Sequence, residues 1–140
     1  MNFATEAELI SFGQKIGKSL NAPAIIELIG DVGSGKTTLA RGIAEGLGIK
    51  TPVISPSFTI SNHYVFAKNN QNSYLVHYDF YRLEDPGLMA EDLAESLNDQ
   101  NTITIIEWAD TVANLLPKNH TVYRIKLNDD GSRHIEEERV

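Results

Sequence analysis

The feature that most constrains the fold is the stretch Gly30-Asp31-Val32-Gly33-Ser34-Gly35-Lys36-Thr37-Thr38. It matches the P-loop pattern of glycine, four free positions, glycine, lysine and then serine or threonine. Glycines let the backbone curl so that several N–H groups point at phosphate oxygens, at the positive end of the helix that follows. We expect the Lys36 ammonium to lie between the β and γ phosphates, and the Thr37 hydroxyl to bind Mg²⁺.

The residues on either side of this motif fit the same interpretation. An apolar run, Ala24-Ile25-Ile26-Glu27-Leu28-Ile29, predicts a buried strand before the loop, and residues 38–44 predict a helix that continues to Leu47-Gly48. The alternative is a glycine-rich turn between a strand and a helix that binds no ligand. The two flanks together favour the phosphate site.

Size and composition limit the classes of protein to consider. The 140 residues, of which 41% are hydrophobic, predict a single domain over residues 1–140 with a continuous core. The lack of cysteine excludes disulfides and thiolate zinc sites. A net charge of -7 argues against unaided binding of nucleic acid. Because the apolar runs near the N-terminus are short, we expect a cytoplasmic protein that does not contact membranes. We also expect it to be monomeric alone.

Hydrophobic periodicity predicts the remaining elements. The apolar spacing over residues 3–20 predicts one helix, which a capping box formed by Thr5 and Glu8 starts. A second helix is expected at residues 88–97. The expected strands are residues 59–67, 73–80, 102–108, 122–128 and 132–140, with a polar hairpin tip between the first two and an Asp-Gly turn between the last two. Together these elements predict an α/β, three-layer P-loop NTPase-like fold. Its mixed sheet has a central parallel part and antiparallel hairpins, and helices flank it.

Residues 51–59 are expected to be extended, because prolines disfavour helix in the residues before them. Ser55, Ser57 and Thr59 alternate along this segment. Such a row of hydroxyls is typical of a loop that senses a γ-phosphate or Mg²⁺, and it is equally typical of ordinary turn chemistry. The pattern alone leaves both interpretations open.

Two carboxylates follow apolar strands. Asp79 ends the strand predicted over residues 73–80, and Glu107 ends the strand predicted over residues 102–108. The sheets of α/β proteins gather ligands at strand carboxyl ends, and Mg²⁺ prefers hard oxygen ligands. Behind a P-loop, one acid can bind the metal while the other orients a water, although either could instead be a solvated charge at the end of a strand.

With these landmarks in place, the sequence resembles the bacterial TsaE (YjeE) proteins, small P-loop ATPases needed to make threonylcarbamoyladenosine on tRNA. Four segments carry the resemblance, in the order the family has them. They are the P-loop, Ser55-Pro56-Ser57-Phe58-Thr59, the run from His77 through Asp79 and Tyr81 to Arg82-Leu83, and Ile106-Glu107-Trp108. The family usually has threonine where this chain has Ser57, which keeps the hydroxyl and loses a methyl group.

The resemblance implies a nucleotide site, a metal and partners. It implies ATP binding by Asp31, Gly33, Ser34, Gly35, Lys36, Thr37 and Thr38, with Thr5 and Arg133 also near the nucleotide. It further implies Mg²⁺ at Thr37 and Glu107, and a metal-linked or catalytic role for Asp79. The expected partners are TsaB and TsaD, with TsaD performing the transfer to tRNA, so that this chain meets tRNA only indirectly.

The resulting hypothesis is hydrolysis of ATP. Lys36 and the loop amides stabilise charge on the phosphates, and Asp79 or Glu107 positions the attacking water. No arginine finger is evident in the sequence. Arg41 lies in the helix after the loop, and Arg82 is the only other arginine near a motif. We therefore expect slow turnover without partners. Two alternatives are a nucleotide-gated binding module without essential turnover, and a small-molecule kinase. The kinase would need a basic lid, which the sequence does not supply.

Overall fold

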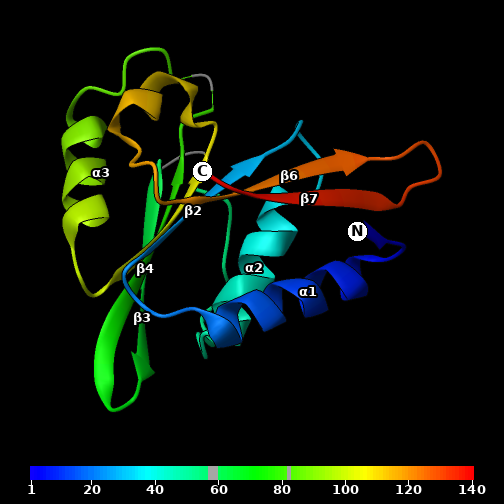
Figure 1. Ribbon diagram of the computed structural model, residues 1–140, viewed down its shortest axis with the longest axis horizontal. Coiled ribbons are helices and arrows are strands. Elements are labelled where there is room, and N and C mark those ends of the chain that lie inside the picture. Colours follow the sequence, from blue (N-terminus) through cyan, green and yellow to red (C-terminus); the bar gives the residue numbers. More distant parts are fainter. Residues whose placement is uncertain (57–59, 82) are drawn as a thin grey trace.

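The computed structural model describes residues 1–56, 60–81 and 83–140. Within these residues the chain forms a seven-stranded sheet with helices on both faces (Figure 1). In chain order the elements are β1 (Asn2–Phe3), α1 (Glu6–Ser19), β2 (Ala24–Ile29), α2 (Lys36–Gly46), β3 (Ser61–Lys68), β4 (Gln71–Asp79), α3 (Leu88–Asn98), β5 (Thr102–Glu107), the 3₁₀ helix η1 (Ala109–Leu115), β6 (Thr121–Leu127) and β7 (Arg133–Arg139).

The sheet is parallel at its centre and antiparallel at its sides. Its strand order is β1-β7-β6-β2-β5-β4-β3, and β2 runs parallel to both of its neighbours. β4 runs parallel to β5, whereas the pairs β1–β7, β6–β7 and β3–β4 are antiparallel. This arrangement confirms the α/β fold with a mixed sheet that the sequence predicts.

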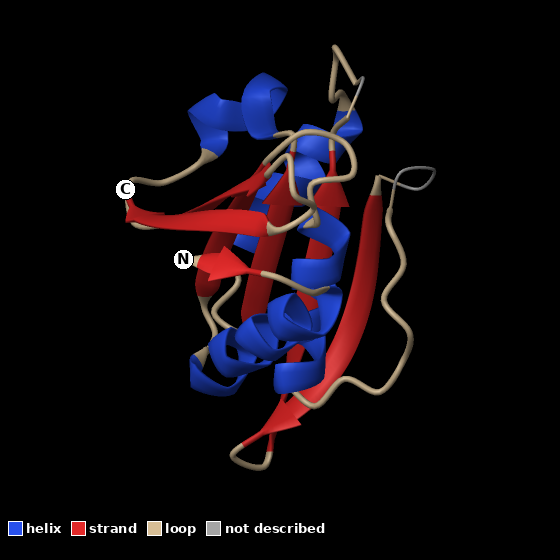
Figure 2. Ribbon diagram, turned by 90° about the vertical axis from the view of Figure 1, so that its right-hand side faces the viewer, coloured by secondary structure: helices blue, strands red, loops and turns tan. Residues whose placement is uncertain are grey.

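Alternation along the strands divides the apolar side chains between two cores. In β2, Ile26 and Leu28 belong to the core beneath α1 and α2, which lie together on one face of the sheet (Figure 2). On the opposite face, Tyr78 and Ile106 pack with Leu93 of α3 and with residues of η1. The sheet is therefore the middle of three layers, and no described helix is long and apolar enough to cross a membrane.

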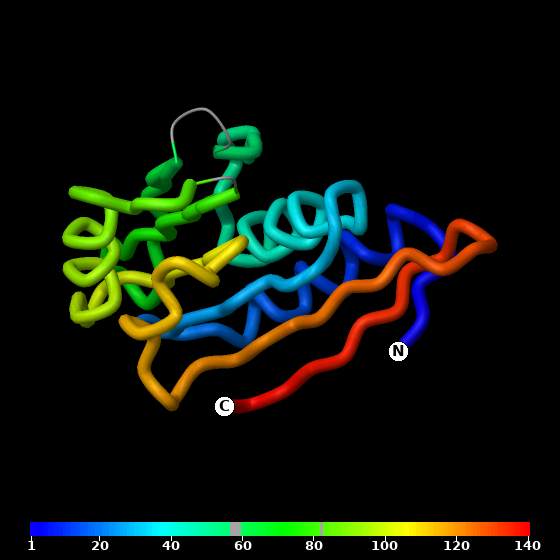
Figure 3. Tube along the Cα trace, turned by 90° about the horizontal axis from the view of Figure 1, so that it is seen from above, coloured from blue at the N-terminus to red at the C-terminus, as the bar shows by residue number. Residues whose placement is uncertain are grey.

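The N-terminal segment differs from the prediction in one respect. The helix begins after Thr5, as predicted, and the Thr5 hydroxyl accepts a hydrogen bond from the Glu8 amide at 3.2 Å. The two residues of β1, however, pair with β7, and the Met1 ammonium donates to the Ile135 carbonyl at 3.1 Å. The N-terminus consequently lies beside the hairpin of β6 and β7 (Figure 3). A strand of two residues is too short to give a periodic signal.

Two further differences concern connections. η1 was not predicted, because a short 3₁₀ helix carries little periodic pattern. The hairpin of β3 and β4 continues to Lys68 and Gln71, so its loop is only Asn69-Asn70, both with positive φ, and the predicted polar tip is shorter than expected. Residues 57–59, which the prediction assigned to the extended segment and the start of the next strand, lie outside the described residues.

Glycines explain how α1 packs so closely on α2. A Cβ at Gly13 would lie 2.9 Å from the Cα of Gly42, and a Cβ at Gly42 would lie 2.6 Å from the Ile10 carbonyl oxygen. Added Cβ atoms at Gly17 and Gly46 would overlap the opposing backbone in the same way. Because these glycines lack a Cβ, the backbones of the two helices can touch, although glycine has a low helix propensity.

We therefore expect Gly17→Ala and Gly46→Ala to destabilise the protein, each by about 1–3 kcal/mol, because the new methyl group overpacks the contact. Urea unfolding followed by circular dichroism measures this change. Ser11→Ala, on the exposed face of α1, is the matched control and should leave the free energy of unfolding nearly unchanged. If both glycine variants were more stable, as helix propensity alone predicts, the close contact would be disproved.

Candidate functional site

Three strand ends meet at one edge of the sheet. β2, β5 and β4 are parallel neighbours, and their registers pair Leu28 with Glu107 and Glu107 with Asp79. β2 continues directly into residues 30–35, the loop that precedes α2. The loop and both carboxylates therefore lie at the carboxyl edge of the sheet, where α/β proteins bind ligands.

The loop turns sharply between β2 and α2. Gly33 and Gly35 have φ angles of 81° and 116°, in the left-handed region that favours glycine. α2 begins at Lys36 immediately after the turn, and no described side chain caps its first turn. The N–H groups of that turn, with the positive end of the helix dipole, form an arrangement suited to an anion.

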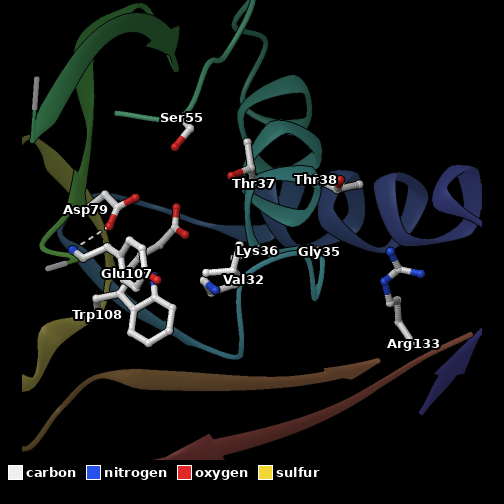
Figure 4. Close-up of a pocket in the computed structure, with 12 residues that line it drawn as sticks. Val32, Gly35, Lys36, Thr37, Thr38, Ser55, Asp79, Glu107, Trp108 and Arg133 are labelled. Carbon is white, nitrogen blue, oxygen red and sulfur yellow. Dashed lines mark hydrogen bonds between the residues drawn. The ribbon is translucent and has the colours of Figure 1, made fainter. Parts of the chain in front are cut away.

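A cavity of about 320 Å³ opens at this edge, a volume at the lower end of the range of ligand pockets (Figure 4). Its lining comprises Val32, Gly33, Gly35, Lys36, Thr37, Thr38, Ser55, Asp79, Tyr81, Glu107, Trp108 and Arg133. Asp79 and Glu107 lie on one side of the cavity, and Thr37 and Lys36 on α2 lie across from them (Figure 4). The structure thus brings together most of the residues proposed from the sequence.

The Lys36 side chain bends back over its own loop. Its ammonium donates to the Gly30 carbonyl at 2.5 Å and to the Asp31 carbonyl at 2.9 Å. It also lies 4.5 Å from the centre of the Trp108 ring, within range of a cation–π interaction. With only 6% of the residue exposed, this cation is largely enclosed by main chain and indole.

Opposing effects act on the pKa of Lys36. Burial is the largest and lowers the pKa below the ordinary value of 10.5, because the charged form loses hydration. The negative charges of Glu107, Asp79 and Asp31 raise it, in that order of size, without cancelling the effect of burial. An anion that entered the cavity would add to the second group of effects and favour the charged form.

Trp108 joins the cavity to η1. Its φ of 55° and ψ of 53° place a bulky residue in the left-handed region, a strained conformation that is held by its surroundings. The indole lies against Tyr81, with 4.6 Å between ring centres. The Trp108 ring also contacts the Lys36 ammonium. The two aromatic rings form one wall of the cavity.

The two carboxylates are held differently. The Asp79 carboxylate accepts a hydrogen bond from the Tyr81 amide at 2.9 Å, in a turn at the end of β4. The Glu107 carboxylate lies 2.5 Å from Nε2 of His77, and both side chains are almost fully buried. Each acid is therefore fixed by a partner of its own and lines the cavity as well.

Arg133, at the start of β7, reaches the other end of the cavity. Its guanidinium donates to the main-chain carbonyls of Ser34 and Gly131, at 2.8 Å in each case. Thr5 caps α1 and is not part of the cavity lining, and neither are Asp31 and Ser34, two loop residues also proposed from the sequence.

Sequence reasoning missed two contacts of this site. It gave no role to His77. His77 and Asp79 lie two residues apart on one face of a strand, and this spacing could have indicated that His77 lies near the site. It also did not foresee that the Tyr81 ring would lie against Trp108, a contact between segments far apart in the sequence. Ser57, Thr59 and Arg82 lie outside the described residues.

The sheet, the loop and the helix that follows it define a P-loop NTPase-like α/β protein. A solved structure supports this class: the crystal structure of Bacillus subtilis YdiB superimposes with a TM-score of 0.76 at 30% identity, covering 96% of this chain and 80% of that one.

Sequence comparisons then identify the family. The family model described as Threonylcarbamoyl adenosine biosynthesis protein TsaE matches residues 3–136. A tRNA threonylcarbamoyladenosine biosynthesis protein TsaE from Nostoc is 33% identical over 136 residues, which cover 95% of this chain and 81% of that protein. The protein of the same name from Bacillus subtilis is 40% identical over 113 residues, 79% of this chain and 66% of the relative. The chain belongs to the TsaE family, whose members take part in the biosynthesis of threonylcarbamoyladenosine in tRNA.

The burial of Lys36 leads to a measurable prediction. In the protein without nucleotide, the Lys36 ammonium should titrate below 10.5, because burial outweighs the neighbouring carboxylates. A ¹³C and ¹⁵N NMR titration measures this pKa, and the spectrum of Lys36→Met assigns the signal. The pKa of Lys36 is lower in the folded protein than in the unfolded chain. The buried charge therefore lowers the free energy of unfolding by its full amount at neutral pH, and this effect disappears as the pH rises through the folded pKa. A titration at or above 10.5 would show that the carboxylates dominate.

Proposed function

We propose that this protein binds ATP with Mg²⁺, hydrolyses it slowly, and thereby supports a TsaB–TsaD complex that forms threonylcarbamoyladenosine on tRNA. One observation carries the proposal. A cation, a hydroxyl and two carboxylates, those of Lys36, Thr37, Asp79 and Glu107, line one cavity at the amino end of α2. This set contains the groups that a P-loop ATPase needs for phosphate, metal and water.

The chemistry of the donors fits a magnesium ion. Thr37, Asp79 and Glu107 offer hydroxyl and carboxylate oxygens, the ligands that Mg²⁺ prefers, and they line the cavity together. These three residues would hold the ion in company with the phosphates. When bound, the ion would neutralise charge on the phosphate oxygens.

The chain's own groups supply binding and orientation. The first N–H groups of α2 have no side-chain cap and would be available to a phosphate, and the Lys36 ammonium would add a positive charge beside them. Asp79 and Glu107 lie on the opposite side of the cavity. Either carboxylate would accept a hydrogen bond from the attacking water and turn it toward the phosphorus. Positioning and electrostatic stabilisation of this kind account for most catalysis of phosphoryl transfer.

Slow turnover without partners follows from the arginines. Among the described residues, Arg133 is the only arginine that lines the cavity, and its guanidinium donates to two main-chain carbonyls. An arginine finger directed at the transferred phosphate contributes about 10³ to 10⁵ in rate in other P-loop enzymes. A partner complex that supplies or reorients such a cation would accelerate hydrolysis. The net charge of -7 supports contact with tRNA through partners rather than directly.

Calorimetry with ATP and Mg²⁺ tests binding. The wild-type protein should bind, and Lys36→Met should weaken the affinity by about 10- to 100-fold, because a charge-assisted hydrogen bond to phosphate is lost. Lys50→Met, an exposed lysine beyond α2, is the matched control and should bind like the wild type. If the folded wild-type protein bound no adenine nucleotide, the proposed function would be wrong.

A second experiment separates turnover from binding. Glu107→Gln and Asp79→Asn remove one charge each while keeping the shape of the side chain, so we expect the part of nucleotide binding that does not depend on Mg²⁺ to persist and hydrolysis to fall by about 10²-fold or more. Each variant is introduced into cells depleted of the native protein, and modified tRNA is measured. Loss of threonylcarbamoyladenosine supports a role for hydrolysis. Full rescue by a variant that binds but does not hydrolyse would favour a nucleotide-gated binding module.

A further inference from the structure

A buried histidine holds one of the two site carboxylates. His77 and Glu107 lie on the adjacent parallel strands β4 and β5, where the register pairs His77 with Ile105, two residues before Glu107. Nε2 of His77 is 2.5 Å from Oε2 of Glu107, and the two side chains are 1% and 3% exposed. This pair of polar side chains is therefore almost completely removed from water.

The hydrogen-bond requirements of the pair assign the proton. A carboxylate only accepts, so the hydrogen of the imidazole belongs on Nε2. Nδ1 of His77 is buried and has no partner among the described residues. Buried acceptors without a partner are tolerated more often than buried N–H groups, so the tautomer with a lone pair on Nδ1 is the one that fits.

This hydrogen bond uses one carboxylate oxygen of Glu107 and leaves the other available to a ligand. Oε2 accepts from His77, and none of the described residues donates to Oε1. Glu107 lines the cavity next to Asp79, its register partner on β4. A glutamate has three side-chain torsions, and fixing one oxygen in a buried hydrogen bond limits the positions that the other can take.

The pair is not needed to join the strands. Backbone pairing between β4 and β5 already extends from Tyr74–Thr102 to Asp79–Glu107. Burying a polar pair in this way contributes little net stability compared with apolar side chains of similar volume. The arrangement is therefore better explained by what it does to Glu107 than by the stability of the sheet.

We infer that His77 is a positioning residue: its Nε2–H holds Oε2 of Glu107 so that Oε1 is presented to the metal and the water in the cavity. This inference rests on the proposed function and extends it to a residue outside the cavity lining. Partners that orient a metal-binding side chain typically contribute about 10- to 100-fold in metal affinity or activity.

Two isosteric substitutions test the inference. In His77→Gln the amide nitrogen takes the position of Nε2, so the bond to Glu107 is kept. In His77→Asn the amide nitrogen takes the position of Nδ1, so the bond is lost while a buried amide of similar polarity remains. We expect His77→Asn to lower kcat by about tenfold or more. We expect a similar decrease in the factor by which Mg²⁺ raises the affinity for nucleotide. His77→Gln should restore both quantities to within about threefold of the wild type.

Binding without metal distinguishes positioning from damage to the fold. Calorimetry of ATP binding in EDTA should give the same affinity for both variants and the wild type, because among the described residues the hydrogen bonds of Lys36 go to the loop carbonyls and that of His77 goes to Glu107. His63→Asn, at an exposed position of β3, is the matched control and should leave every quantity unchanged. If His77→Asn and His77→Gln behaved alike in kcat and in the effect of Mg²⁺, the positioning role would be wrong even though the wild type hydrolyses ATP. Absence of Mg²⁺-dependent ATP binding by the wild type would overturn the proposed function, and this inference with it.

Discussion

The site depends on the register of three parallel strands. Pairing Leu28 with Glu107, and Glu107 with Asp79, brings the end of β2 and two carboxylates to the same edge of the sheet. A slip of one residue in either pairing would turn a carboxylate to the opposite face and into the core beneath α3. The loop and the first turn of α2 form an arrangement suited to an anion, and the register places the two acids opposite them.

Local sequence signals were sufficient for much of this architecture. The P-loop and its flanks predicted β2 and α2, and the fold class followed from the order of the elements. Asp79 and Glu107 were placed at strand ends because apolar runs stop there, and such runs are strong signals when a strand is buried. The glycine spacing in the loop was informative as well, because Gly33 and Gly35 adopt backbone angles that other residues avoid.

Contacts between distant segments were beyond the reach of the sequence. The bond between His77 and Glu107, and the tilted ring contact between Tyr81 and Trp108, depend on which strands become neighbours and in what register. The enclosure of the Lys36 ammonium by loop carbonyls and an indole likewise depends on Trp108 taking a left-handed conformation, which its residue type disfavours. β1 was missed because its pairing with β7 is set by the tertiary structure alone.

The short length of β1 has a consequence for the behaviour of the protein at high concentration. β1 covers only the first residues of β7, and residues 136–139, Glu-Glu-Glu-Arg, continue along the border of the sheet as exposed side chains. A second molecule that added a strand there would have to bring its own backbone against a row of mostly negative charge. Charged residues on an edge strand are a common protection against this kind of aggregation, so this border of the sheet is poorly suited to nucleate intermolecular β-structure.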